Sequence, residues 1–303
     1  MTREAFEKIA RKAFPGAELL GMRELAGGVS AQVTELAVLA GGRERQMVVR
    51  RHGAADLERN PRVAADEYKL LRLLRGAGLP VPEPYFADES GEIFDSPYVA
   101  IAFVDGKADF APVDLDGSIA QLAGVLADIH RVEGKRDELG YLPAQEAVCA
   151  GMIAARPARL DESLDEGRIR ACLELGWPPE RRNKRVLLHG DFWPGNVLWR
   201  DGRLAAVIDW EDAALGDPLA DLANARLETL FAFGEEAMRA LTRHYVARMP
   251  DLDDASLPYW ELCAALRACR LSSWGLAPEV ERRMRERHRR FVDQAFGKLS
   301  GPG

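Results

Sequence analysis

The residues best suited to chemistry lie in one short stretch, residues 185–212. Within it, His189-Gly190-Asp191 follows an apolar run, Asn196 comes five residues after Asp191, and Asp209 ends a later apolar run. Two carboxylates and one amide oxygen form a hard-oxygen ligand set, which suits Mg²⁺. The stretch has a single His and no Cys, so it does not match the ligand set of a zinc site.

A β-hairpin would bring these side chains together. Apolar runs at 197–199 and 204–208 flank Asp201-Gly202, and Gly tolerates the positive φ that a tight hairpin turn requires. In such a hairpin Asn196 stands at the start of one strand and Asp209 at the end of its partner. The loop that holds Asp191 lies just upstream, so we expect the three side chains to converge.

Composition narrows the class of protein. The chain has 303 residues, 47% of them hydrophobic and 29% charged, which fits a globular protein of two domains or one large domain. A net charge of −7 argues against nucleic acid as the main partner. There is no apolar run of eighteen residues and the N-terminus lacks the apolar core of a secretory signal, so we expect neither a membrane partner nor secretion. Four scattered cysteines predict no disulfide framework, and the expected location is the cytoplasm.

The first hundred residues predict a small antiparallel sheet with one inserted helix. Strand-like runs at 33–39, 46–50, 84–87 and 98–103 follow a short amphipathic helix at 2–14. The inserted helix is predicted to run from Asn60-Pro61 to about Arg75, because Asn caps first-turn amides and Pro is tolerated at the first helical position. Glu67 lies in this helix, where its plain interpretation is a solvated charge. Gly27-Gly28 is either a simple hairpin turn or a loop whose amides approach phosphates.

The remainder of the chain predicts mostly helices. Residues 104–107 form a linker, after which Ile119, Leu122, Leu126 and Ile129 repeat on a helix ending at His130, which we expect to cap or pack at that end. Residues 155–183 have helical character, broken at Pro178-Pro179, and helices resume from Asp221. The basic run at 281–290 is typical of a solvated helix face.

These features together resemble the aminoglycoside phosphotransferase and choline kinase-like group of small-molecule kinases, relatives of the protein kinases. The family pattern His-Gly-Asp, four residues, Asn is matched by residues 189–196, and its Ile-Asp-Trp/Phe element by Ile208-Asp209-Trp210. The following Gly216-Asp217-Pro218, and then Asp221-Leu222-Ala223, also look like the family's continuation. The resemblance implies an α+β, two-lobed protein-kinase-like fold. In that fold residues 1–104 form a nucleotide-binding lobe with a small antiparallel sheet, and residues 105–303 form a larger, mostly helical catalytic and substrate-binding lobe.

The resemblance also implies roles in the helical lobe and the hairpin. Asp191 looks like the catalytic base, which accepts a hydrogen bond from the substrate hydroxyl and aims it at the γ-phosphorus. Asn196 and Asp209 look like the Mg²⁺ ligands, with the ion bridging nucleotide phosphates. His189 is similar to the family's histidine that orders the catalytic loop.

Nucleotide binding is implied for the sheet lobe. The family usually places a Lys on the third strand, and Arg50 stands at the matching position, where its guanidinium can hold a phosphate bidentately. Glu67 matches the family's helix glutamate, which pairs with that cation. The loop containing Gly28 and Ser30 would approach the phosphates, and Phe103 and Val104, at the start of the linker, would contact the base.

The implied activity is Mg²⁺-dependent transfer of the γ-phosphate of ATP, or of GTP, to a hydroxyl of an aminoglycoside-like, amino-alcohol or sugar metabolite. Glu211, Asp212 and Asp217 would favour a cationic acceptor, or they have structural roles, with Asp217 capping a turn. Five aromatic residues line an acceptor pocket or belong to the core (Trp193, Trp210, Phe231, Phe233 and Trp274). Antibiotic resistance does not follow from the fold.

Two other hypotheses stay open. The first is a nucleotide-binding homologue that has lost catalysis, which the Arg in place of Lys favours. The second is a metal-dependent hydrolase built on His189 and Asp191. The partner in the kinase hypothesis is a small molecule rather than nucleic acid, and the sequence does not define an oligomeric state.

Overall fold

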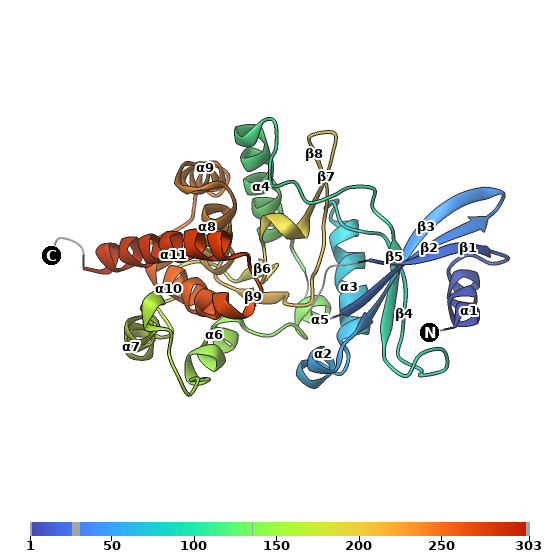
Figure 1. Ribbon diagram of the computed structural model, residues 1–303, viewed down its shortest axis with the longest axis horizontal. Coiled ribbons are helices and arrows are strands. Elements are labelled where there is room, and N and C mark those ends of the chain that lie inside the picture. Colours follow the sequence, from blue (N-terminus) through green and yellow to red (C-terminus); the bar gives the residue numbers. More distant parts are fainter. Residues whose placement is uncertain (1, 26–30, 135, 301–303) are drawn as a thin grey trace. The chain divides into compact units, whose positions relative to one another are not determined.

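The structure, a computed structural model, describes residues 2–25, 31–134 and 136–300. It contains two compact units (Figure 1). The first unit comprises Met1–Gly106 and Ala205–Glu211, and the second comprises Lys107–Leu204 and Asp212–Gly303. The segment that carries Asp209 therefore belongs to the unit formed by the N-terminal third of the chain.

The first unit is built around a five-stranded antiparallel sheet with strand order β1-β2-β3-β5-β4. Gly41 and Gly42 both have positive φ, of 60° and 74°, and close the tight turn between β2 and β3. The elements of this unit are α1 (Arg3–Ala13), β1 (Glu18–Leu25), β2 (Ala31–Ala40), β3 (Arg43–His52), α2 (Ala54–Arg59), α3 (Val63–Gly76), β4 (Pro84–Asp88) and β5 (Tyr98–Ala102).

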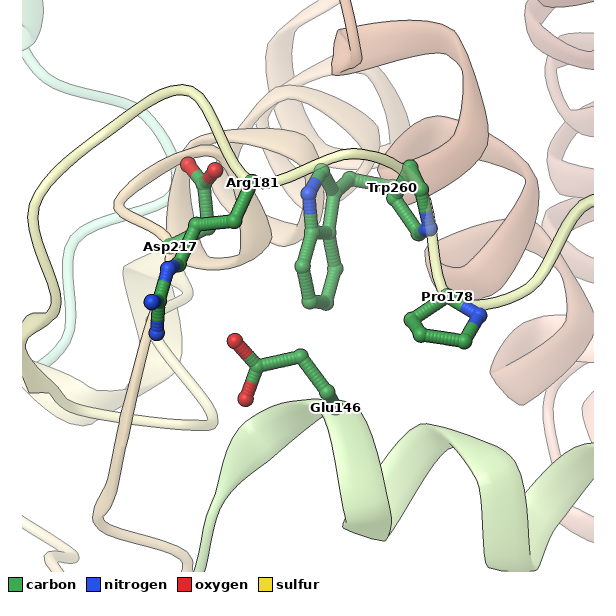
Figure 2. A pocket seen from close by; sticks show the side chains of 6 residues that line it. Glu146, Pro178, Arg181, Asp217 and Trp260 are labelled. Atoms are coloured by element: carbon green, nitrogen blue, oxygen red, sulfur yellow. The ribbon is translucent and has the colours of Figure 1, made fainter.

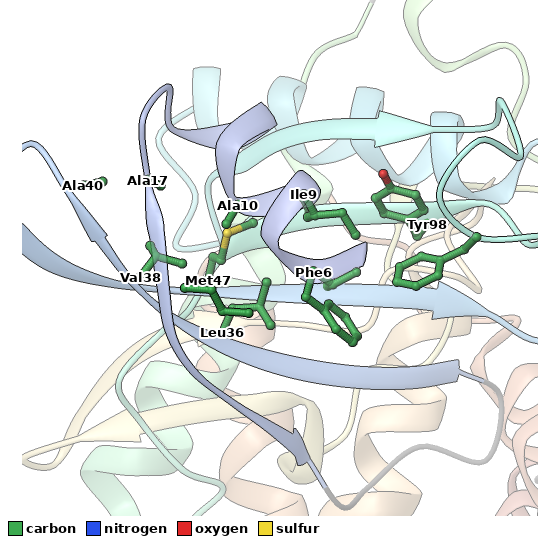
Figure 3. Close-up of a cluster of buried hydrophobic side chains, with 13 residues drawn as sticks. Phe6, Ile9, Ala10, Ala17, Leu36, Val38, Ala40, Met47 and Tyr98 are labelled. Atoms are coloured by element: carbon green, nitrogen blue, oxygen red, sulfur yellow. The ribbon is translucent and has the colours of Figure 1, made fainter. Parts of the chain in front are cut away.

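One face of this sheet packs against α1. Side chains alternate between the two faces of a strand, so Leu36, Val38 and Met47 point to the same side. There they pack with Phe6 and Ile9 of α1 in a buried apolar cluster (Figure 3). The predicted amphipathic helix at the N-terminus therefore supplies one half of the core of this unit.

The opposite face of the sheet carries α3, and here the helix prediction was wrong in one respect. Asn60 ends α2 instead of starting α3: its N–H donates to Asp56 O at 2.7 Å, and its side-chain Oδ1 accepts from Arg62 N at 2.9 Å. The unit therefore has two helices between β3 and β4, not one. The six residues of α2 were missed because so short a helix has no apolar periodicity.

The second unit is mostly helical, and its strands form short pairs. β6 pairs antiparallel with β9, and β7 pairs with β8. Its main elements are α4 (Leu115–His130), α5 (Arg136–Leu139), α6 (Gln145–Ala154), α7 (Glu166–Gly176), β6 (Val186–Leu188), β7 (Val197–Arg200), β8 (Arg203–Val207), β9 (Ala214–Gly216), α8 (Leu219–Phe233), α9 (Glu235–Val246), α10 (Leu257–Arg267) and α11 (Pro278–Leu299). Short 3₁₀ turns cover Glu162–Leu164, Pro194–Asn196 and Ala268–Ser273.

The predicted hairpin is confirmed. β7 and β8 are joined by Asp201 and Gly202, whose φ values of 52° and 72° are those of a tight left-handed turn. Within β8 the chain passes from the second unit to the first, after Leu204. The α+β class, with an antiparallel sheet followed by many helices, is also confirmed.

Two further predictions can be compared with the structure. Residues 155–183 are helical only in α7 and one 3₁₀ turn, so the predicted helical character is confirmed for less than half of that range. All four cysteines are free, as their scattered positions indicated. Among the described residues, no helix combines the length and the apolar character that a membrane span needs.

Candidate active site

A buried aspartate downstream of the hairpin holds the backbone of the loop that contains Asp191. Asp221, near the start of α8, accepts hydrogen bonds from His189 N at 2.6 Å and from Gly190 N at 2.9 Å. Its Oδ2 also lies 3.3 Å from Nε2 of His130. Burial opposes ionisation of Asp221, but the hydrogen bond and charge of His130, together with His189, lower its pKa. The loop is therefore fixed through its backbone by an ionised side chain.

His189 and His130 each hold neighbouring segments of the second unit through hydrogen bonds. His189 is fully buried, and its Nδ1 accepts a hydrogen bond from Asp191 N at 3.3 Å. This contact agrees with the supporting role that the resemblance implied. His130 lies at the end of α4, where its Nδ1 is 2.6 Å from the hydroxyl of Tyr245. The prediction that His130 packs at its helix end is confirmed.

Gly190 is required by the path of the loop. Its φ is +81°, and a Cβ atom at this position would lie 1.9 Å from the carbonyl oxygen of Asp212. Both the left-handed conformation and the close approach of the two chain segments exclude other residues. The glycine of the His-Gly-Asp motif is therefore required for steric reasons.

Asp191 and Asn196 lie together, as their spacing predicted. The side-chain Nδ2 of Asn196 donates to Asp191 O at 2.9 Å and lies 3.3 Å from Asp191 Oδ2. Asn196 is 6% exposed. Because its amino group is used to hold the loop, its amide oxygen is the atom left to act as a ligand.

Two residues that the sequence analysis missed surround Asp191. The guanidinium of Arg267, at the end of α10, donates to Gly190 O at 2.8 Å and lies 3.0 Å from Asp191 Oδ1 and 3.1 Å from Asp212 Oδ2. Glu228, on α8, has a pKa raised to about 7, by burial and by the negative charge of Asp191, against the opposing charge of Arg267. Neither residue has a local motif, so only the fold reveals their position.

In the first unit, Arg50 is the centre of a buried ionic cluster. Its Nη1 donates to Glu67 Oε1 at 2.9 Å, and its Nη2 contacts Asp209 Oδ1 at 2.6 Å and Glu211 Oε2 at 2.5 Å. These three carboxylates raise the pKa of Arg50 despite its burial. The pairing of Arg50 with Glu67 is the one that the family resemblance implied, and Glu67 is a buried ion-pair partner, not a solvated charge.

Glu67 has a second partner in His52, whose Nε2 lies 3.1 Å from Glu67 Oε2. Burial alone would raise the pKa of Glu67, but the charge of Arg50 and the contact with His52 lower it to about 2. The Glu67 carboxylate is therefore ionised at neutral pH.

Asp209 has a φ of 67°, which is uncommon for residues other than glycine. Because this conformation is not extended, Asp209 lies beyond the end of β8. Its neighbour Trp210 is buried, with Nε1 donating to Val207 O at 3.1 Å. Asp209 and Asn196 belong to different units, so their convergence on one metal ion stays a prediction.

The other predicted nucleotide contacts are only partly described. Phe103 follows β5, and its N–H donates to Gln46 O at 3.3 Å, which leaves its carbonyl group for other contacts. Val104 is partly buried just beyond it. Gly28 and Ser30 lie outside the described residues.

The three acidic residues suggested for a cationic acceptor already have partners. Glu211 contacts Arg50 and Asp212 contacts Arg267. Asp217 Oδ1 accepts from Leu219 N and from Asn183 Nδ2, both at 3.0 Å, so the predicted turn cap is confirmed. These contacts favour the structural alternative for all three residues.

The aromatic residues suggested for an acceptor pocket differ in their burial. Trp210 and Phe231 are buried core residues, whereas Trp274 is 41% exposed. Trp193, in the loop between Asp191 and Asn196, packs on Phe110 with 6.0 Å between ring centroids. Of these five aromatic residues, Trp193 is therefore the one nearest in sequence to Asp191.

The chain is similar to several curated proteins. Over 198 residues it is 26% identical to mouse acyl-CoA dehydrogenase family member 10, a match that covers 59% of this chain and 18% of that protein. The chain thus spans about a fifth of the length of the first curated relatives that it matches. It is also 28% identical over 259 residues to the homoserine kinase of Rhodospirillum rubrum, with 77% of each chain covered.

Solved structures share the fold. A crystal structure from Ralstonia eutropha JMP134, provisionally assigned as an aminoglycoside phosphotransferase, has a TM-score of 0.70 at 17% identity and covers 99% of this chain and 98% of its own. A thermostable mutant of the aminoglycoside phosphotransferase APH(4)-Ia, in ternary complex with ADP and hygromycin B, has a TM-score of 0.64 at 20% identity and covers 98% and 100%. At these identities the likeness establishes the aminoglycoside kinase-like fold alone.

The family itself is established by a model of the phosphotransferase enzyme family, which matches residues 21–257. This range contains the ionic cluster of Arg50, the catalytic loop and Asp221. It extends over most of the chain, in agreement with the resemblance drawn from residues 189–196 and 208–210. The chain belongs to the phosphotransferase enzyme family.

Proposed function

We propose that this chain transfers the γ-phosphoryl group of ATP, or of GTP, to a hydroxyl group of a small molecule. One observation carries the proposal: the loop of His189, Gly190 and Asp191 is anchored through its backbone by Asp221, which holds the Asp191 carboxylate in a defined place next to Asn196. Phosphoryl transfer needs a protein to position groups and neutralise charge rather than to form covalent bonds. A rigid loop that presents one carboxylate suits that task.

Asp191 is the proposed catalytic base. Its side chain is 30% exposed, so an acceptor can approach it, and Arg267 fixes the orientation of the carboxylate through Oδ1. In this role Asp191 accepts a hydrogen bond from the acceptor hydroxyl and takes its proton as the bond to phosphorus forms. His189 and Asp221 are positioning residues, because they contact the loop backbone.

The donor set fits a divalent ion that prefers oxygen. The amide oxygen of Asn196 is left for a ligand because its amino group is bonded to Asp191, and Asp209 contributes a carboxylate held by Arg50. These two residues are the proposed ligands of Mg²⁺, which would neutralise charge on the nucleotide phosphates. Both residues occur at the matching places of the family motif.

The sheet unit is proposed to hold the nucleotide. Arg50 would contact its phosphates, with Glu67 keeping the guanidinium in place, and Phe103 and Val104 would lie beside the base. Gly28 and Ser30 are proposed phosphate contacts on the resemblance alone. The presence of ADP in the related APH(4)-Ia complex supports this assignment.

The acceptor is proposed to be an amino sugar, an amino alcohol or a sugar. The names of the relatives support this range, since they include a homoserine kinase and a hygromycin-B 4-O-kinase. The test is a screen that follows ADP or GDP release with Mg²⁺ and either nucleotide across amino sugars, amino alcohols, hydroxy amino acids and sugars. Release that depends on one class of acceptor would support the proposal.

The screen, combined with binding and thermal-denaturation measurements, separates the two alternatives. Tight binding of Mg²⁺-nucleotide without transfer to any acceptor would overturn the kinase proposal in favour of a nucleotide-binding homologue. A melting temperature that rises with metal alone and does not change with nucleotide would favour the metal-dependent hydrolase.

A further inference from the structure

Two aromatic side chains pack together at the loop that contains the proposed catalytic base. Trp193 comes two residues after Asp191, and its ring centroid lies 6.0 Å from that of Phe110, with 40° between the ring planes. All three residues belong to the second unit. We propose that Trp193 and Phe110 form a stacking surface for the acceptor, and that the acceptor is a ring, a sugar or a cyclitol, rather than an open chain. The inference rests on the proposed transfer reaction and narrows its range of acceptors.

The loop directs the side chain of Trp193 away from the core. Phe192 is 2% exposed, and its ring packs edge-on against His189 with 5.9 Å between ring centroids. Trp193 has an extended backbone, with φ −146° and ψ 162°, and neighbouring side chains on extended backbone point in opposite directions. Phe192 therefore anchors the loop, while Trp193 stays only partly buried.

The position of the indole is fixed by the loop itself. A Cβ atom on Gly195 would lie 2.2 Å from Cη2 of Trp193, so the ring lies directly against the backbone, where only glycine leaves room for it. The carbonyl oxygen of Trp193 also accepts a hydrogen bond from Asn196 N at 3.0 Å. The same short loop thus holds the indole and the Asp191 carboxylate.

The segment that carries Phe110 is attached to the hairpin. Lys107 N donates to Trp199 O at 3.0 Å, and Trp199 N donates to Lys107 O at 2.8 Å, so this segment runs beside β7. Asp109 Oδ1 then accepts from Ala111 N at 3.0 Å, a side-chain turn that shapes the chain around Phe110. Phe110 is 51% exposed in this fixed position, so its ring is accessible to a ligand.

An exposed aromatic pair favours an acceptor with a flat apolar face. The C–H groups on one face of a pyranose or cyclitol ring are weakly positive, and they pack well on the negative face of an aromatic ring. A rigid ring also loses little conformational freedom on binding, whereas an open-chain polyol or amino alcohol must be ordered. This mode of recognition needs no carboxylate, and those of Asp191 and Asp212 already contact Arg267.

A pocket of about 190 Å³ in the same unit is not the expected acceptor site (Figure 2). Its lining does not include Asp191, Trp193 or Phe110. The two carboxylates that line it, on Glu146 and Asp217, already have partners within the chain. The stacking surface, in contrast, shares a loop with the proposed base.

The first test locates binding without nucleotide. The full-length chain is titrated with ring compounds (methyl glucoside, glucosamine and myo-inositol) and with open-chain compounds (sorbitol, homoserine and ethanolamine). We expect at least one ring compound to shift the indole N–H signal of Trp193, assigned through Trp193→Phe, and the open-chain compounds to bind at least tenfold more weakly. An unchanged Trp193 signal with every ring compound at millimolar concentration would overturn the inference, as would equal affinity for the open-chain compounds.

The second test uses variants and isothermal titration with the best ring compound. Phe110→Ala and Trp193→Ala should each weaken binding at least about fivefold, whereas Trp193→Phe, which keeps an aromatic ring, should bind within about threefold of wild type. Leu175→Ala removes an apolar side chain that is 92% exposed on α7 and should leave binding unchanged. Thermal denaturation checks that each variant folds. Unchanged affinity in both alanine variants would contradict the stacking surface.

Kinetics connect this surface to the reaction. With a ring acceptor, Phe110→Ala should raise KM at least about fivefold and leave kcat within about twofold, because Phe110 contacts neither the base nor the nucleotide in this account. A fall in kcat at unchanged KM would contradict the inference. Since binding is measured without nucleotide, a chain that binds rings through Trp193 but transfers no phosphate would fail as a kinase while the stacking surface stands.

Discussion

Nη2 of Arg267 lies 3.0 Å from Oδ1 of Asp191 and 3.1 Å from Oδ2 of Asp212. One guanidinium thus joins the proposed catalytic base to the segment that follows the hairpin. A third contact, to Gly190 O at 2.8 Å, ties the same group to the loop backbone. Since all three contacts come from one side chain at the end of α10, Arg267 is expected to set the orientation of the base.

Removing Arg267 should affect turnover more than stability. In Arg267→Gln we expect kcat to fall by at least about tenfold, because the carboxylate of Asp191 loses its fixed partner. The side chain is 41% exposed, so the unfolding free energy should change by only about 1 kcal/mol or less. Steady-state kinetics and urea denaturation measure the two effects. Arg270→Gln, an exposed arginine three residues further on, is the matched control and should leave both values unchanged.

Substitution of Gly190 should disable the loop. A Cβ atom in Gly190→Ala would meet the Asp212 carbonyl at 1.9 Å, so the backbone of the loop must move. We expect kcat to fall at least about 10²-fold, as for other misplacements of a catalytic group. Gly202→Ala is the control, because Gly202 also has positive φ but its Cβ atom would meet nothing within 4 Å. Equal losses in the two variants would mean that strain alone, rather than the close approach, explains the effect.

The buried cluster of Arg50 should make stability depend on pH in the acid range. Because Glu67 has a folded pKa of about 2 against an ordinary 4.5, its ionised form stabilises the fold above 4.5, and this contribution is lost as the pH falls from 4.5 toward 2. In Glu67→Gln we expect the free energy of unfolding to fall by about 3 kcal/mol at pH 7, because Arg50 loses a buried partner. We expect no larger fall, because Asp209 and Glu211 still contact Arg50.

The measurement is urea denaturation of both proteins at pH 7 and pH 3.5. The difference between them should shrink at the lower pH. A difference that is the same at both values would contradict the lowered pKa of Glu67. The exposed Glu58 provides the control substitution, Glu58→Gln, which should have little effect at either pH.

Glu228 should have the opposite pH dependence. Its pKa is raised to about 7 from 4.5, so the folded protein favours the protonated form. The stability that this gives is present below pH 4.5 and is lost as the pH rises through 7. Relative to wild type, Glu228→Gln should therefore gain stability between pH 5 and pH 8. We also expect the pH–rate profile of the wild type to have a step near pH 7 that the profile of Glu228→Gln lacks, because the charges of Glu228 and Asp191 affect each other. An unchanged profile in the variant would assign that step to another group.

The local pattern of the chain was enough to predict the hairpin and the catalytic loop. Asp201-Gly202 specifies a turn by its backbone preference, and the spacing of Asp191 and Asn196 places both in one loop; these are short-range relations that a sequence contains directly. The pairing of Arg50 with Glu67 needed the family resemblance, since strand and helix are separated by another helix that had no periodic signal.

Contacts between distant segments could not be predicted. Asp221 was noted only as part of the motif's continuation, and its bonds to His189 N and Gly190 N depend on how α8 packs. Arg267 and Glu228 each stand alone in the sequence among many similar charged residues. Their proximity to Asp191 results from the packing of α8 and α10, which tertiary structure alone determines.

The most direct test of the proposed function is transfer of labelled phosphate from [γ-³²P]ATP to the best acceptor of the screen, by wild type and by Asp191→Ala. We predict that the variant loses at least about 10²-fold in single-turnover rate, the low end of the contribution of a general base, while its affinity for Mg²⁺-ATP stays within about twofold. Asp212→Asn, which removes the other carboxylate that Arg267 contacts, should lose much less. Transfer by Asp191→Ala at the wild-type rate would contradict the account.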